Sequence, residues 1–183
     1  MTVAGLVLAA GGGRRYGRPK APVVVDGERL VDRAVRVLSE AGCAPVVVVL
    51  GAWTGDVPGA RVVDNPDWET GMGSSLRAGL AALADVPGVD GVVVSLVDLP
   101  GLTADAVRRL VLTGGGGPEA LAAATFDGAR GHPVLLGRGH WAGVAASAAG
   151  DRGARAYLDS IADDLVLVEL GHLADGTDLD HPT

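Results

Sequence analysis

The chain has 183 residues, the length of one domain, and 48% of them are hydrophobic, which is enough for a substantial core. Its formal net charge of −7 argues against general binding to nucleic acids or anionic membranes, because both favour a basic surface. The single cysteine, Cys43, cannot form an internal disulfide, as is typical of a reducing cytoplasm. We therefore expect one cytoplasmic domain over residues 1–183, as a monomer or small homo-oligomer, with no nucleic-acid or membrane partner.

The first half of the chain alternates apolar runs with segments of helical periodicity. Residues 3–8 form a continuous apolar run, which predicts a strand covered on both faces. Residues 30–41 carry apolar side chains at the spacing of one helix face, and Gly42 follows as a typical helix end. The same patterns predict a short extended segment at 22–25, strands at 45–50, 60–63 and 91–96, and a helix at 73–84.

The second half continues the alternation. Thr103 suits the N-cap of a helix that ends by Leu112. Further strands are predicted at 120–125, 133–136 and 165–170, and further helices at 140–149 and 153–161. Strands that alternate with helices predict an α/β fold with a mainly parallel sheet. In such sheets, ligands bind beyond the carboxyl ends of the strands.

The segment after the first predicted strand is rich in glycine and in basic residues. Glycine has no Cβ, so the run Gly11-Gly12-Gly13 can turn its backbone N–H groups towards an anion. Lys20 is the only lysine beside fourteen arginines, which indicates a need for a compact ammonium. The simplest ligand for this combination is a polyphosphate. The alternative is a tight strand-to-helix turn with surface arginines.

Asp98 follows another predicted strand, at the sheet edge where the glycine run also lies. A carboxylate beside bound phosphates is well placed to hold Mg²⁺, which is usually bound by one or two carboxylates plus substrate phosphates. Taken alone, Asp98 also suits a turn or a helix cap. Asp178 and Asp180 form a second acidic pair near the end of the chain, and in isolation they are solvated acids.

Three further segments carry polar groups of candidate sites. Ser74 and Ser75 open a predicted helix, where they suit either a nucleotide contact or an N-cap. His132 interrupts a predicted strand pair, as a hydrogen-bond donor to a second substrate or as a structural turn residue. Residues 150–155 form a mixed-charge loop, whose alternative interpretation is a surface ion pair of little energetic value.

Five ordered segments together resemble the MobA-like nucleotidyltransferases, and this resemblance spans almost the whole chain. They are Leu-Ala-Ala-Gly-x-Gly-x-Arg-x-Gly-x-x-Lys at 8–20, Asn-Pro-x-Trp-x-x-Gly-Met-x-Ser-Ser-Leu at 65–76, Leu-x-Asp-x-Pro at 96–100, Arg-Gly-His-Pro-Val-Leu at 130–135 and Gly-Asp-x-Gly-Ala-Arg at 150–155. Within that family, Ala10 makes the chain most similar to the molybdenum cofactor cytidylyltransferases, whose loop reads Leu-Ala-Ala-Gly.

The resemblance implies a three-layer α/β/α, Rossmann-like (GT-A-like) domain with a mostly parallel sheet. It implies Mg²⁺-dependent transfer of a nucleoside monophosphate from a nucleoside triphosphate (NTP), with CTP favoured over GTP, to a small phosphate-bearing acceptor such as molybdopterin, with release of pyrophosphate. The implied catalytic residues are Arg15, Lys20 and Asp98, and the metal ligands are Asp98 and Asp180. The implied nucleotide-binding residues are Leu8, Ala9, Ala10, Gly11, Gly12, Gly13, Arg15, Lys20, Gly71, Ser74 and Ser75. Gly131 and His132 are implied to bind the acceptor.

The chain departs from the family pattern at Tyr16, where Met is usual, at Gly73, which replaces a serine, and in its last residues. Three alternatives follow. An NAD(P)H-dependent oxidoreductase of the nicotine-blue type would use the same glycines, although Gly17 comes one position late for the dinucleotide fingerprint. A guanylyltransferase acting on a phospholactate-type acceptor stays within the same enzyme class. The altered tail would suit a non-catalytic nucleotide-binding module.

Overall fold

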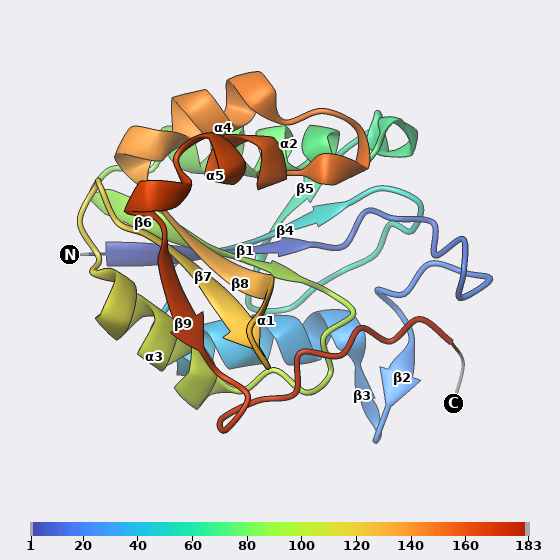
Figure 1. The fold of residues 1–183 in the computed structure, drawn as a ribbon. Coiled ribbons are helices and arrows are strands. Elements are labelled where there is room, and N and C mark those ends of the chain that lie inside the picture. The colour runs from blue at the N-terminus through green and yellow to red at the C-terminus, as the bar shows by residue number, and fades with distance from the viewer. Residues whose placement is uncertain (1, 182–183) are drawn as a thin grey trace.

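Residues 2–181 are described by the computed structural model, and in them a seven-stranded sheet lies between two layers of helices (Figure 1). The strands follow the order β5-β4-β1-β6-β8-β7-β9. Their bounds are β1 (Thr2–Leu8), β4 (Val46–Leu50), β5 (Arg61–Asp64), β6 (Val89–Leu96), β7 (Leu121–Phe126), β8 (Ala129–Gly137) and β9 (Val166–Glu169). A separate hairpin is formed by β2 (Val24–Val25) and β3 (Glu28–Arg29).

Helices cover both faces of the sheet. One face is covered by α1 (Leu30–Glu40) and α3 (Ala104–Gly114), and the other by α2 (Met72–Ala84), α4 (Trp141–Ser147) and α5 (Arg155–Ser160) (Figure 1). Short 3₁₀ turns occur at Trp68–Thr70, Arg138–His140, Gly150–Arg152 and Ala162–Asp164. Within residues 2–181, no helix has both the length and the apolar character needed to cross a bilayer.

Each face of the sheet has its own hydrophobic core, and β1 contributes to both. Val3 and Val7 belong to the core under α1 and α3, whereas Leu6 and Leu8 belong to the core under α2, α4 and α5. Successive side chains of a strand point to opposite faces, so burial of both faces requires the unbroken apolar run seen in the sequence. Each fully buried Leu or Val contributes roughly 1.5–3 kcal/mol to folding.

The strand order creates a switch point between β1 and β6. Strands β4, β1 and β6 are parallel neighbours, and β5 extends the same parallel set beyond β4. The chain leaves β1 for β4 and β5 on one side and then returns to β6 on the other side. Leu8 pairs with Leu96, so the loops after β1 and β6 leave the sheet side by side. A switch point of this kind is where open α/β sheets bind ligands.

The predicted three-layer α/β/α, Rossmann-like fold with a mostly parallel sheet is confirmed, and the differences are local. Strand β8 is antiparallel to β6 and β7 and is longer than the predicted strand at 133–136. Helix α3 continues to Gly114, two residues past its predicted end, with Thr103 as its N-cap. The predicted helices at 140–149 and 153–161 are shorter, as α4 and α5, and 3₁₀ turns flank them, because the extent of short helices depends on packing more than on propensity.

Candidate active site

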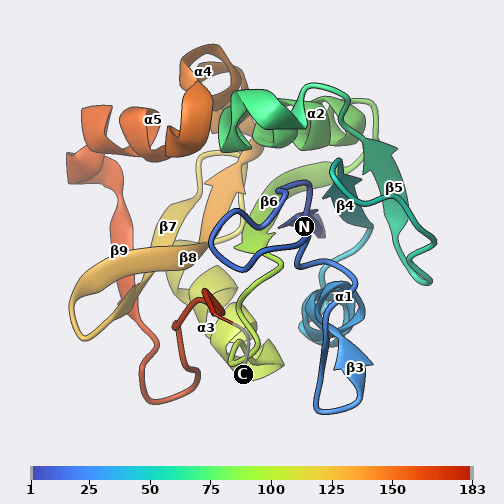
Figure 2. The same ribbon diagram turned by 90° about the vertical axis from the view of Figure 1, so that its right-hand side faces the viewer.

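A cavity of about 280 Å³ opens at the carboxyl ends of β1 and β6. Figure 2 looks onto this edge of the sheet, with the glycine-rich loop after β1 in dark blue at the centre. The volume is near the lower end of the ~300–1,000 Å³ typical of small-molecule pockets. The lining residues are Leu8, Ala10, Gly11, Gly12, Gly13, Arg14, Lys20, Trp68, Glu69, Gly71, Met72, Ser75, Leu96, Val97, Asp98 and Asp151.

The glycine-rich loop has a backbone conformation that a side chain would disrupt. Gly13 has a φ of +63°, and a Cβ placed there would collide with the carbonyl group of Arg18. The N–H of Gly17 donates to the carbonyl of Gly13 at 2.7 Å and closes the loop. Tyr16 is only 7% exposed and packs into the hydrophobic core, while Arg18 lies over its ring at 5.9 Å. Tyr16 therefore anchors the loop from below.

The side chain of Lys20 lies between two carboxylates. Its Nζ is 2.8 Å from Asp98 Oδ2 and 3.2 Å from Asp180 Oδ1, and Arg15 Nη1 is 3.2 Å from the other oxygen of Asp180. Burial lowers the pKa of Lys20, but hydrogen bonds and charges from both carboxylates outweigh this effect and raise the pKa above its ordinary value. The hydrogen bond from Lys20 is the main reason why the pKa of Asp180 is lowered. The sole lysine is therefore a paired ammonium at neutral pH.

The C-terminal segment brings Asp180 to the site by pairing with the loop after β6. The N–H of Leu179 donates to the carbonyl of Asp98 at 2.9 Å, and the N–H of Asp175 donates to the carbonyl of Gly101 at 3.2 Å. Two carboxylates that are 82 residues apart therefore contact one ammonium. The sequence alone places Asp180 in a polar tail, and only these backbone contacts bring it to the sheet edge.

The carboxylates fit a divalent cation that is shared with substrate phosphates. Asp98 and Asp180 accept hydrogen bonds from the same ammonium, so their oxygens lie within two hydrogen-bond lengths of each other. Desolvation and, to a smaller extent, the charges of these two carboxylates raise the pKa of the neighbouring Asp178. Among residues 2–181, no three His, Cys, Asp or Glu side chains are arranged to hold a metal by themselves. This donor set suits Mg²⁺, which usually binds one or two protein carboxylates and fills its other coordination positions with phosphate oxygens and water.

Ser74 and Ser75 are buried at the start of α2, where Asn65 Nδ2 donates to both hydroxyls at 2.9 and 3.0 Å. Ser74 Oγ also lies 2.9 Å from the carbonyl of Gly71 and 3.0 Å from that of Asp67. The helix begins at Met72, and its N-cap is Gly71 rather than Ser74. Ser75 lines the cavity, whereas the Ser74 hydroxyl contacts the backbone carbonyls of Asp67 and Gly71.

His132 lies on β8, partly buried and outside the cavity lining, as does its neighbour Gly131. Burial and, to a smaller extent, the charge of Arg155 lower the pKa of His132 to about 4, although the charge of Asp98 acts in the opposite direction. The imidazole is therefore neutral at physiological pH and lies within electrostatic reach of Asp98. A neutral imidazole has one donor and one acceptor nitrogen.

The predicted site residues thus fall into two groups. Most of the predicted nucleotide-binding residues line the cavity, as do Lys20 and Asp98. Those that do not line it are Ala9, Arg15, Ser74, Gly131, His132 and Asp180. The side chain of Arg15 is 78% exposed, and that of Asp180 is 37% exposed.

Trp68, Glu69 and Asp151 line the cavity, although none of them was among the predicted site residues. The Trp68 ring packs closely against the glycine loop, since a Cβ on Gly12 would lie 3.0 Å from Trp68 Cζ3. An aromatic ring at a cavity wall offers a stacking surface for a nucleobase. Its position just after β5, at the same sheet edge, is the signal that would have identified it.

Comparisons with known proteins identify related sequences and folds. The sequence profile of the MobA-like NTP transferase domain matches residues 5–165. The nicotine blue oxidoreductase of Paenarthrobacter nicotinovorans is 39% identical over 168 residues, which cover 85% of this chain and 81% of that protein. The molybdenum cofactor guanylyltransferase of Rhizobium johnstonii is 36% identical over 133 residues, which cover 73% of this chain but only 61% of that protein. The crystal structure of an Rv0371c homologue from Mycobacterium sp. strain JC1 superposes with a TM-score of 0.79 and 28% identity, covering 98% of this chain and 90% of that one.

Proposed function

Because the chain belongs to the family of MobA-like NTP transferase domains and is therefore a nucleotidyltransferase, we propose that it transfers a nucleoside monophosphate from an NTP to a small phosphate-bearing acceptor. The observation that carries this proposal is Lys20 between Asp98 and Asp180, next to the glycine-rich loop at the β1/β6 switch point. A site for a polyphosphate combines backbone N–H donors, an ammonium group, and carboxylates that hold a cation bridging the phosphates.

In the proposed reaction, an oxygen of the acceptor phosphate attacks the α-phosphorus of the NTP in line with the leaving group. A bond forms between that oxygen and the α-phosphorus, the bond from the α-phosphorus to the bridging oxygen breaks, and pyrophosphate leaves with the electron pair. A phosphomonoester has its second pKa at about 6, so it is largely ionised at neutral pH and needs no strong general base. Lys20 and Arg15 would hold the phosphate oxygens, and the loop N–H groups would orient them.

Asp98 and Asp180 would hold Mg²⁺, because they lie close together and offer oxygen donors. The bound ion would neutralise charge on the triphosphate. For these carboxylates to reach the ion, the Lys20 ammonium has to leave its place between them, and the phosphates of the NTP are the natural new partner for it. Lys20 would thus exchange carboxylates for phosphates when the nucleotide binds.

We propose CTP as the donor, since the segment Leu8-Ala9-Ala10-Gly11 resembles the cytidylyltransferase loop and Ala10 lines the cavity. A methyl group at this position takes space that a glycine would leave to a larger base. GTP is the second candidate donor, because the Rhizobium johnstonii relative is named a guanylyltransferase. Molybdopterin remains the proposed acceptor on the family resemblance, with Gly131 and His132 as the proposed acceptor contacts.

An oxidoreductase activity is the alternative from another class, because the Paenarthrobacter nicotinovorans relative is named a nicotine blue oxidoreductase. A dinucleotide fingerprint places its third glycine three residues after the second. In this chain that position is Tyr16, a buried anchor of the loop, and the next glycine is Gly17. The ion-paired Lys20 also has no role in hydride transfer. We therefore give the nucleotidyltransferase reaction preference.

A thermal-shift panel separates these possibilities. Each of the four NTPs is added with Mg²⁺ or with EDTA, and NADH and NADPH are tested in parallel. A ligand at 100 times its Kd stabilises the folded state by about 2.7 kcal/mol, which raises the Tm of a domain of this size by about 5 °C or more. We expect CTP with Mg²⁺ to give the largest shift. A shift with NADPH and none with any NTP would favour the oxidoreductase, and pyrophosphate release with a chosen acceptor would then fail as well.

A further inference from the structure

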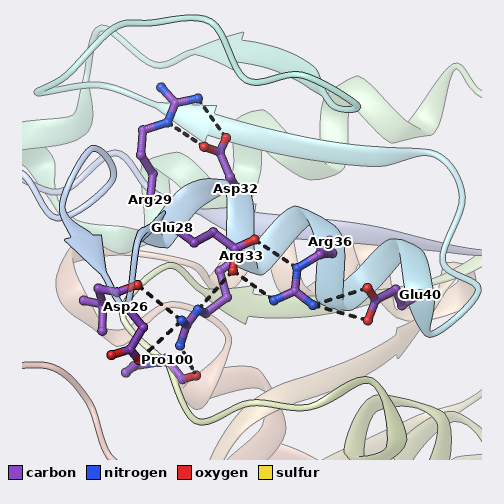
Figure 3. Close-up of polar contacts among 9 residues, drawn as sticks. Asp26, Glu28, Arg29, Asp32, Arg33, Arg36, Glu40 and Pro100 are labelled. Atoms are coloured by element: carbon purple, nitrogen blue, oxygen red, sulfur yellow. Dashed lines mark hydrogen bonds and ion pairs between the residues drawn. The ribbon is translucent and has the colours of Figure 1, made fainter.

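Arg33, in the first turn of α1, is bound to two separate loops (Figure 3). Its Nη1 donates to the carbonyl of Pro100 at 3.1 Å, and its Nη2 donates to the carbonyl of Val25 at 3.3 Å. Its Nε donates to Glu28 at 3.4 Å, and Asp26 lies 3.6 Å from Nη2. The side chain is only 18% exposed. One guanidinium therefore uses all three of its nitrogens to join the loop after β6 to the β2–β3 hairpin.

Each attachment point lies close to a residue of the proposed site. Pro100 comes two residues after Asp98, on the same loop. The hairpin follows Lys20, and the N–H of Val23 donates to the Lys20 carbonyl at 3.0 Å. The N–H of Leu30, at the start of α1, donates to the Val23 carbonyl at 2.8 Å. The helix that carries Arg33 therefore holds the Lys20 segment through its backbone and the Asp98 loop through the Arg33 side chain.

We propose that Arg33 is a positioning residue that sets the separation between Lys20 and Asp98, and that, resting on the proposed function, it thereby prepares the site for an NTP and its metal ion. A guanidinium is a rigid planar fork whose N–H groups point in fixed, different directions. It can therefore hold two carbonyls on different loops at once. A lysine at this position would keep the charge but not this fixed two-sided geometry.

Arg36 offers a matched control on the same helix. It lies one turn further along α1, and its guanidinium binds Glu28 at 2.9 Å and Glu40 at 3.2 Å. Figure 3 shows that it shares Glu28 with Arg33 and bridges Glu28 to Glu40, whereas the contact to Pro100 is made by Arg33. Arg36→Gln therefore removes one positive charge, as Arg33→Gln does, and also removes a contact with the shared partner Glu28. It leaves the two carbonyl attachments of Arg33 in place.

The first test uses the ligand-free protein. Lys20 is the only lysine, so isotope-labelled lysine gives a single side-chain NMR signal that reports directly on the Lys20–Asp98 contact. We expect Arg33→Gln to move this signal towards that of a free lysine, Arg33→Lys to move it part of the way, and Arg36→Gln to leave it unchanged. An unchanged signal in a folded Arg33→Gln variant would overturn the proposal, as would equal displacement in the Arg36→Gln control.

The second test measures binding of CTP and GTP with Mg²⁺ by calorimetry, after urea unfolding has shown which variants are folded. We expect about tenfold weaker binding for Arg33→Gln and less than twofold for Arg36→Gln, since only Arg33 joins the Asp98 loop to the hairpin that follows Lys20. Equal losses in the two variants would contradict the positioning role. If the unmodified protein binds no NTP, the proposed function fails, whereas the lysine signal still decides the role of Arg33. If Arg33→Gln does not fold, Arg33→Lys carries both tests.

Discussion

Substitution of Lys20 by Met should change metal binding and nucleotide binding in opposite directions. In the structure the Lys20 ammonium lies 2.8 Å from Asp98 and 3.2 Å from Asp180, in the place where a cation between the two carboxylates would bind. A divalent ion therefore competes with the ammonium as long as no phosphate draws the lysine away. Methionine keeps most of the side-chain volume and removes the charge, so it ends this competition.

The magnitude follows from the charges. A unit charge about 4 Å from another contributes roughly 4 kcal/mol at an effective dielectric constant of ~20. Salt, water and movement of the lysine reduce this value, and we expect about 1.4 kcal/mol to remain, which is tenfold in Kd. Removing the ammonium also leaves Asp98, whose side chain is 19% exposed, without its partner, so stability should fall by about 1–3 kcal/mol.

The assay is calorimetric titration with Mn²⁺ alone, with Mg²⁺ and CTP together, and with CTP in EDTA. We expect Lys20→Met to bind Mn²⁺ about tenfold more tightly than the unmodified protein and to bind CTP with Mg²⁺ at least tenfold more weakly. Lys20→Arg serves as the control, because it keeps the charge and so should keep the weak Mn²⁺ binding. Equal Mn²⁺ affinity in the unmodified protein and the Met variant would refute competition between lysine and metal.

Three further predictions concern the loop, the histidine and a buried amide. Gly13→Ala should cost about 1–3 kcal/mol in urea unfolding and abolish the CTP thermal shift, because its φ is +63° and its methyl would strike Arg18. Gly11→Ala is the stability control, since a Cβ there has open space around it and should leave the urea unfolding curve unchanged. The pKa of His132 is about 4 in the folded state and 6.5 ordinarily, so the free energy of unfolding should fall by at most ~3 kcal/mol as pH drops from about 6.5 towards 4. His132→Gln should flatten this pH dependence in urea titrations, and the same pH dependence in the variant and the unmodified protein would contradict the prediction. Asn65→Leu should lower the free energy of unfolding by about 2 kcal/mol, because two buried serine hydroxyls lose their donor; a loss below about 0.5 kcal/mol would mean that water replaces it.

The order of strands and helices could be read from the sequence because burial on both faces leaves a plain signal. The apolar runs of β1, β4 and β6 and the periodicity of α1 identify these elements without any tertiary information. The glycine loop and Asp98 could also be assigned to one sheet edge, since both follow parallel strands. The boundaries of short helices such as α4 and α5 were predicted less accurately, because the extent of these helices depends on packing rather than on helix propensity.

The sequence by itself thus determined the fold class, the family resemblance and the two loops that meet at the switch point, because each depends on residues close together in the chain. Only the tertiary structure decided what faces Lys20. The pairing of Leu179 with the Asp98 backbone brings Asp180 to the ammonium, and Arg33 joins the loop on which Asp98 lies to the hairpin that follows Lys20. These contacts join residues that are far apart in sequence, and backbone carbonyls take part in them whatever their side chains. No local pattern of side chains can encode such contacts, because they depend on where the folded chain brings its loops.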